Sequence, residues 1–135
     1  MQNKELYTAR DIKINTLISI TVLVIYSLNR FYIRNIINYK TLVGGFIAFH
    51  LNDFLCGIFF LAVYSLLIKK RIEKFRVCML FIFICAIFWE YITPFFRPDS
   101  YGDWKDVIAY LCGGMAYWGM MKTFNRKSVK KRAIV

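Results

Sequence analysis

Acidic residues are scarce in this sequence, and so are the residues that interrupt helices. The 135 residues include eight Asp and Glu against nineteen Lys and Arg, with one His and two Pro. Hydrophobic residues make up 59% of the chain, which exceeds the roughly 45–50% of a soluble domain. A soluble nucleic-acid binder spreads its Lys and Arg over a polar surface, whereas here they gather at the ends of apolar runs. The composition therefore favours an integral membrane domain and argues against a nucleic-acid partner.

The few cysteines do not form a metal or disulfide pattern. All four lie inside apolar segments, and none belongs to a Cys-x-x-Cys pair. Cysteines in such surroundings usually pack as small hydrophobic residues. We therefore expect neither a disulfide framework nor a thiolate zinc site.

The apolar segments predict an all-α bundle of four transmembrane helices within a single domain, residues 1–135. Crossing a bilayer takes roughly 20 apolar residues in a helix. The predicted helices and the basic tail that follows them cover residues 12–33, 42–68, 77–95, 104–121 and 122–135. Gly44 and Gly45 are expected to break or tilt the second helix, and Pro94 to kink or end the third.

The distribution of basic residues predicts the orientation of the bundle. Fourteen of the nineteen Lys and Arg lie in the N-terminal stretch, in the turn 69–76 and in the tail, and the other five lie in or near the connectors 34–41 and 96–103. Loops rich in Lys and Arg remain cytoplasmic. Both termini are therefore predicted to be cytoplasmic, with the two connectors outside. The basic tail is interpreted as an orientation signal with affinity for anionic membrane lipids.

Half of the acidic residues lie between two apolar runs, in residues 88–107. At about 1.5 Å of rise per helical residue, Asp53, Glu90 and Asp106 come to a common height, roughly 20–24 Å above the inner boundary of a hydrocarbon core about 30 Å thick. An ionised acid facing lipid at that depth costs about 2.5–3.5 kcal/mol. The three carboxylates are therefore predicted to turn inward into an outward-facing polar pocket.

The predicted pocket also includes neighbouring polar residues. Its members are His50, Asn52, Asp53, Glu90, Arg97, Asp99, Asp103, Asp106 and Tyr110. Asp53, Glu90 and Asp106 are the candidate ligands of a divalent cation, and glycines such as Gly57 and Gly113 are expected to let the helix backbones approach closely. Alternatively, Asp103 and Asp106 occupy the start of a helix simply because the helix dipole favours negative charge there.

The order of these residues resembles the VanZ-like group of small bacterial membrane proteins. The matching positions are His50, Phe54, Gly57, Glu90, Arg97, Asp103, Asp106 and Gly113. Thr93 and Tyr110 stand where the group usually has Gln and Asn, which favours a sister family that shares the fold. The resemblance implies a multi-pass protein of the bacterial cytoplasmic membrane, linked to glycopeptide antibiotic tolerance, and it implies no particular reaction.

Three functions fit such a pocket. In the first, an envelope protein binds a lipid head group or a lipid-linked cell-wall intermediate. His50 and Arg97 would hold the phosphate, and the acids would orient them or hold a cation. In the second, a membrane hydrolase or transferase holds a divalent cation on its acids and uses His50 as general acid or base. In the third, a homo-oligomer transports an ion or solute, because four helices are few for a transporter.

Overall fold

The computed structural model describes residues 7–96 and 103–132, and every regular element within these ranges is helical. In chain order the elements are α1 (Ala9–Leu28), the π-helical turn η1 (Asn29–Ile33), α2 (Arg34–Ile36), α3 (Leu42–Phe49), α4 (Leu51–Ile68), α5 (Phe75–Ile87), the π-helical turn η2 (Phe88–Ile92), the 3₁₀ turn η3 (Thr93–Phe95) and α6 (Trp104–Arg132). The predicted all-α fold is thereby confirmed.

Among the described residues, three helices are long and apolar enough to cross a membrane. They cover Ala9–Ile36, Leu51–Ile68 and Phe75–Ile92, and they correspond to the first three predicted spans. The fourth predicted segment lies in α6, which continues to Arg132. The helix therefore extends past the predicted end at residue 121, and the basic tail is helical as far as Arg132.

The predicted second helix is divided at His50 and not at the glycines. His50 has φ −116° and ψ −14°, and it separates α3 from α4. Its N–H still donates to the carbonyl of Phe46, and its own carbonyl accepts from the N–H of Phe54. Gly44 and Gly45 lie inside α3, whose first turn is capped by the Thr41 side chain. The break therefore falls at a polar residue and sets the His50 side chain at the junction of two helices.

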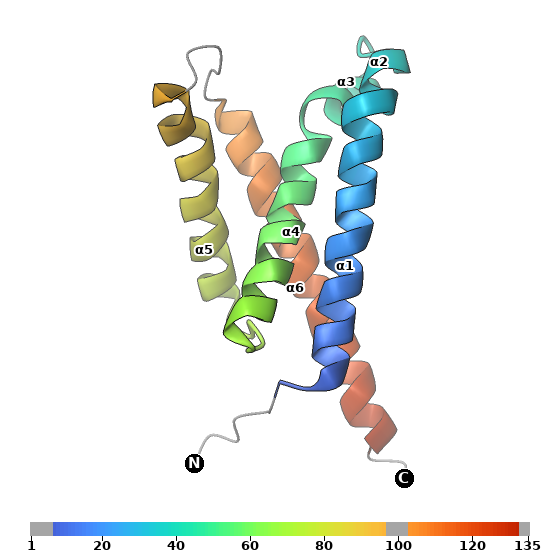
Figure 1. Cartoon of the computed structure of the whole chain (residues 1–135), viewed down its shortest axis with the longest axis vertical. Helices are drawn as coiled ribbons and strands as arrows, with labels where there is room; N and C mark the ends of the chain where they lie inside the picture. The colour runs from blue at the N-terminus through green and yellow to red at the C-terminus, as the bar shows by residue number, and fades with distance from the viewer. Residues whose placement is uncertain (1–6, 97–102, 133–135) are drawn as a thin grey trace.

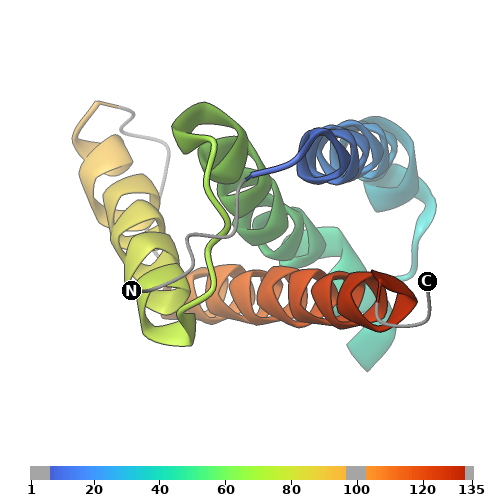
Figure 2. The same cartoon turned by 90° about the horizontal axis from the view of Figure 1, so that it is seen from below.

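α4 lies between α1 and α5, and α6 runs across the row formed by these three helices (Figures 1 and 2). α6 packs on α4 and α5, and α1 packs on α4. The start of α1 and the end of α6 lie at one end of the bundle, called here the terminal end (Figure 1). The opposite end carries α2, α3 and the start of α6, and is called the α3 end. α4 and α6 both run from the α3 end toward the terminal end.

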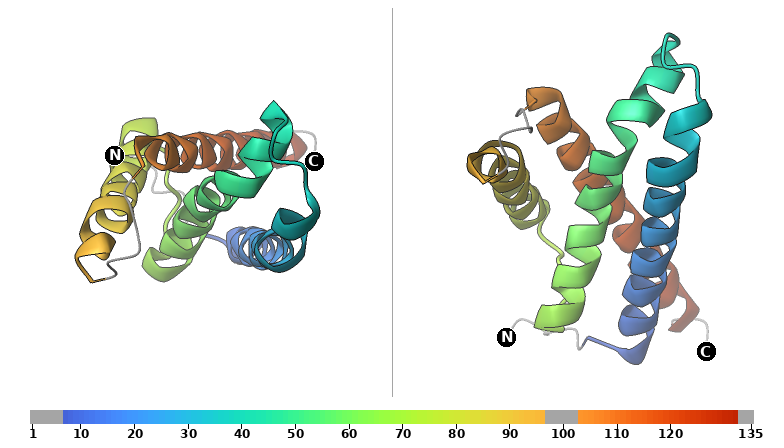
Figure 3. Two further views of the ribbon diagram at one scale, coloured as in Figure 1. Left: turned by 90° about the horizontal axis from the view of Figure 1, so that it is seen from above. Right: turned by 45° about the horizontal axis from the view of Figure 1, so that its top comes forward.

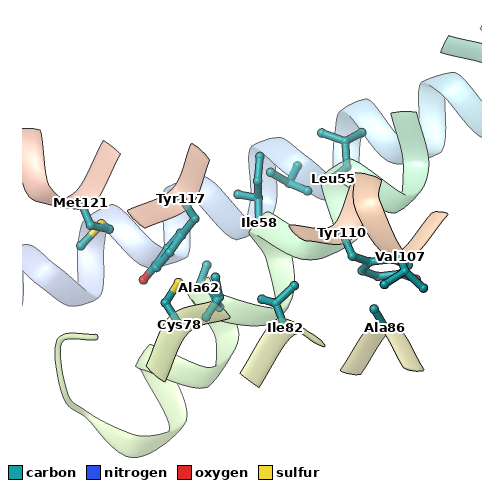
Figure 4. Close-up of a cluster of buried hydrophobic side chains, with 12 residues drawn as sticks. Leu55, Ile58, Ala62, Cys78, Ile82, Ala86, Val107, Tyr110, Tyr117 and Met121 are labelled. Carbon is teal, nitrogen blue, oxygen red and sulfur yellow. The ribbon is translucent and has the colours of Figure 1, made fainter. Parts of the chain in front are cut away.

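The hydrophobic core lies where α4, α5 and α6 meet (Figure 4). α4 contributes Leu55, Ile58 and Ala62, and α5 contributes Cys78, Ile82 and Ala86. Close packing depends on two glycines: a Cβ built on Gly113 would overlap the carbonyl oxygen of Phe54, and one built on Gly57 would overlap that of Tyr110. α4 and α6 thus touch backbone to backbone, which confirms the close approach predicted from the glycines.

Replacing Gly113 by alanine should destabilise the protein, whereas the same change at Gly119 should not. Alanine gains about 1 kcal/mol of helix propensity at either site. At Gly113 that gain is outweighed, because forcing α4 and α6 apart costs about 1–3 kcal/mol or more, while Gly119 has no neighbouring atom within 4 Å of an added Cβ. Thermal unfolding of the detergent-solubilised protein measures both variants. Equal midpoints for Gly113→Ala and Gly119→Ala would contradict the close crossing.

Candidate functional site

Three of the predicted pocket residues bring their side chains together at the α3 end. His50 comes from the junction of α3 and α4, Asp53 from the first turn of α4, and Asp106 from the first turn of α6. One potential ligand atom of each lies within 4.8 Å of those of the other two. The Nδ1 atom of His50 is 2.7 Å from Oδ1 of Asp106. We call these three residues the His-Asp-Asp cluster.

Glu90 adds a buried carboxylate beside this cluster. Its side chain lies in the π-helical turn η2, only 8% of its surface is exposed, and Oε2 accepts a weak hydrogen bond of 3.5 Å from the backbone N–H of Asp103. A carboxylate oxygen of Asp53 lies within 4.8 Å of one of Asp106, and Glu90 is close enough for its charge to act on Asp53 as well. Carboxylates this close repel one another when ionised, and a shared proton or a bound cation removes the repulsion.

Two further predicted residues have contacts of another kind. Oδ1 of Asp103 accepts from the N–H of Lys105 at 2.9 Å, so this side chain caps the start of α6. Oδ1 of Asn52 accepts from Nδ2 of Asn29 at 2.8 Å. Asn29 is fully buried and also donates to the carbonyl of Ile47 at 3.0 Å. Asn52 therefore joins α4 to η1, although its neighbour Asp53 belongs to the cluster.

The π-helical turns η1 and η2 hold the buried polar side chains Asn29 and Glu90. A π-helical turn rotates the residues that follow it relative to an α-helix, and such turns are frequent at functional sites. Both lie toward the α3 end, each in the last part of a helix long enough to span a membrane. No periodicity argument based on 3.6 residues per turn could have predicted them.

Tyr110 lies one turn beyond Asp106 and is almost completely buried. Its ring stacks on Phe60, with centroids 6.1 Å apart and planes 11° apart. The ring and Asp53 both line a cavity of about 220 Å³. On the other side, His50 borders a wide and shallow groove of about 560 Å³ together with Lys40 and Thr41. The remaining predicted residues, Arg97 and Asp99, lie outside the described residues.

A second buried polar group lies toward the terminal end of the bundle, and the sequence analysis did not predict it. Arg71, in the turn between α4 and α5, donates from Nε to Oδ1 of Asp11 at 3.0 Å and from Nη2 to Oδ2 at 2.9 Å. Asp11 Oδ2 also accepts from the N–H of Thr8 at 2.7 Å, which caps α1. The side chains of Asp11 and Arg71 are 3% and 14% exposed. This two-point ion pair joins α1 to the turn that enters α5.

Asn15 extends this group to α6. It is fully buried, its Oδ1 accepts from the hydroxyl of Tyr117 at 2.7 Å, and its Nδ2 donates to the carbonyl of Asp11 at 2.9 Å. A sequence signal for it exists, because Asp11, Asn15 and Ser19 recur every four residues and therefore share one helix face. The charge pattern alone identifies Arg71 only as one of several basic residues predicted to be cytoplasmic.

Removing the acid of the ion pair should destabilise the fold strongly. Asp11→Ala removes the carboxylate that the largely buried Arg71 guanidinium contacts at two points, and breaking a buried pair costs about 3–5 kcal/mol. Glu73→Ala is the matched control, because Glu73 is an exposed acid two residues after Arg71. Urea or thermal unfolding in detergent should separate the two variants. An unfolding midpoint for Asp11→Ala as high as that of Glu73→Ala would show that the ion pair contributes little to the stability of the fold.

No family model matches this chain, and none of the curated proteins or solved structures compared with it does so either. The resemblance to the VanZ-like group therefore stays a prediction, and the functional argument depends on the geometry of the chain itself.

Proposed function

We propose that this chain is an integral protein of the bacterial cytoplasmic membrane that binds the phosphate of a lipid head group or lipid-linked cell-wall intermediate through a divalent cation. The observation that carries the proposal is the convergence of His50, Asp53 and Asp106 from different helical segments. Such a protein would be VanZ-like in its site, with the pocket facing outward.

The charge of the cluster supports a cation as the first ligand. Asp53, Asp106 and the adjacent Glu90 are all acids, and His50 is the one described histidine beside them. These groups alone repel a phosphate, whereas a divalent cation held by them attracts it. Carboxylate oxygens suit Mg²⁺, Ca²⁺ and Mn²⁺, and imidazole suits transition metals. Mn²⁺ is therefore a suitable probe for this mixed set.

The distances support the same conclusion. Metal–ligand bonds of about 2.0–2.2 Å place two ligand atoms at most about 4.4 Å apart across the metal. The ligand atoms of the cluster already lie within 4.8 Å of one another, so shifts of a few tenths of an ångström bring them to metal-binding distances. His50 and Asp106 are about one-quarter and one-fifth exposed, which leaves the cation open to an incoming phosphate.

Purified protein in detergent should bind one Mn²⁺ per chain, as measured by electron paramagnetic resonance during titration. Asp106→Asn removes a charged ligand and should weaken binding at least tenfold, and Asp53→Asn should do the same. Glu73→Gln is the control, since it removes one negative charge from the turn between α4 and α5. Mn²⁺ affinities that are the same in Asp106→Asn and Glu73→Gln would argue decisively against the site.

The proposed membrane topology uses α6 as a fourth span and puts both termini in the cytoplasm. It is supported by the position of the start of α1 and the end of α6 at the same end of the bundle (Figure 1), which an even number of crossings requires. The basic turn after α4 contacts Asp11 near that end. This arrangement leaves the His-Asp-Asp cluster at the outer surface.

A reporter fused after residue 135 tests this topology. We expect a fluorescent C-terminal fusion and an inactive alkaline phosphatase fusion, because phosphatase requires export while green fluorescent protein matures in the cytoplasm. A phosphatase fused within the connector 96–103 should be active. The reverse pattern of activities at the two positions would exclude four spans with cytoplasmic termini.

A second candidate function is hydrolysis or transfer at the same phosphate. The 2.7 Å contact between His50 and Asp106 favours it, because a carboxylate that orients an imidazole is a common arrangement for proton transfer. Release of inorganic phosphate from a lipid phosphate by the Mn²⁺-loaded protein distinguishes this candidate from binding alone. Transport has less support, since the Gly57–Gly113 approach and the buried Ile58 and Leu61 fill the space between α4 and α6 below the cluster.

A further inference from the structure

The cavity of about 220 Å³ beside Tyr110 begins at the cluster and continues into the apolar part of the bundle. Asp53 forms part of its lining, together with Cys56, Phe59 and Phe60 of α4. Trp89 of η2, Tyr110 of α6 and residues of α1 line the rest of the cavity. Asp53 is thus shared between the proposed cation site and this cavity.

The cavity changes from polar to aromatic along α4. From Asp53 to Phe60 the helix advances about 10 Å, away from the α3 end and toward the hydrocarbon core in the proposed topology. The carboxylate lies at the first position, the thiol of Cys56 one turn further, and the two phenylalanines one turn beyond that. A ligand that matches this order has a charged head followed directly by a hydrocarbon chain.

The cavity is also accessible from the side of the bundle. α1 packs on α4 and α5 packs mainly on α6, and α1 and α5 lie on either side of α4 (Figure 3). Leu23 of α1 and Trp89 of η2 line the cavity and are about half exposed. In a membrane these exposed surfaces face lipid, and a lipid chain can enter without leaving the bilayer.

We propose that the site takes a lipid phosphate whose phosphate is attached directly to a single hydrocarbon chain, as in a polyprenyl phosphate, with the phosphate on the cation and the first segment of the chain in this cavity. This inference rests on the proposed function and specifies its ligand. A cavity of about 150 Å³ holds one benzene ring, so 220 Å³ admits a short length of one chain. Because Asp53 borders both the cation site and the cavity, a chain attached directly to the phosphate fits better than the chains of a diacyl lipid, which a glycerol separates from the phosphate. Phe59, Phe60 and Trp89 line the cavity and offer large apolar faces to such a chain.

The experiment compares two tryptophan substitutions in adjacent positions of α1. Leu23→Trp narrows the cavity, whereas Val24→Trp adds the same bulk at a residue that is 53% exposed and does not line it. Binding of a polyprenyl phosphate, dioleoyl phosphatidate and inorganic phosphate to the Mn²⁺-loaded protein is measured by native mass spectrometry and by competition. Mn²⁺ affinity of each variant is measured in parallel and also reports correct folding.

We expect wild type and Val24→Trp to bind polyprenyl phosphate at least tenfold more tightly than phosphatidate. Leu23→Trp should bind polyprenyl phosphate at least tenfold more weakly than wild type, with an unchanged Mn²⁺ affinity. Equal polyprenyl phosphate affinities of Leu23→Trp and Val24→Trp would overturn the assignment of the chain to this cavity. Inorganic phosphate that displaces polyprenyl phosphate at equal concentration would overturn it too. If the chain site fails in this way but Asp106→Asn still weakens Mn²⁺ binding, the proposed function remains supported. If Asp106→Asn leaves Mn²⁺ binding unchanged, both proposals are overturned.

Should Leu23→Trp lose Mn²⁺ affinity through misfolding, Trp89→Ala provides the second test. Trp89 is 51% exposed, so its removal opens a wall of the cavity without emptying the core. Polyprenyl phosphate affinity should fall at least threefold while Mn²⁺ affinity stays unchanged. An unaltered preference for polyprenyl phosphate over phosphatidate in Trp89→Ala overturns the assignment of the chain to this cavity.

Discussion

The backbone contact between α4 and α6 at Gly57 and Gly113 determines where the polar residues of this protein meet. Both helices run from the α3 end, and each carries its acid in the first turn. Because no side chain separates the helices at the crossing, their first turns are also held close together. Asp53 and Asp106 come into contact for this reason, and the helix break at His50 adds an imidazole to them.

The bundle buries its polar side chains in two groups, with an apolar core between them. Toward the α3 end the group is acidic, and its charges are not balanced by a described Lys or Arg side chain in direct contact. Toward the terminal end, Asp11 is matched by Arg71 at two points and is capped by Thr8. Polar groups within a membrane must find their partners inside the protein. The terminal-end group satisfies this rule by itself, whereas the acidic group has room for a cation.

The cation and the lipid chain complement each other in the proposed site. A cation alone would bind any accessible phosphate, and the cavity alone would bind any apolar chain. Asp53 belongs to both surfaces, so a ligand that fills both must carry its phosphate directly on its chain. Selectivity then comes from the connection between head and chain, without requiring a polar contact to a particular sugar or peptide.

The helical class, the membrane character and the common height of the acids follow from the sequence by itself, because run length, charge distribution and a rise of about 1.5 Å per residue are local properties. The tertiary structure alone decided which polar side chains share a site. Asn52 and Asp53 are neighbours in sequence, but the Asn52 side chain is hydrogen-bonded to Asn29 of η1, whereas that of Asp53 lies beside Asp106 of α6. Asp11 and Arg71 are 60 residues apart, and both lie in segments whose basic residues predict only the orientation of the bundle. Such pairs depend on how each helix is rotated about its axis, and that rotation is set by π-helical turns and by packing at glycines, which hydropathy does not record.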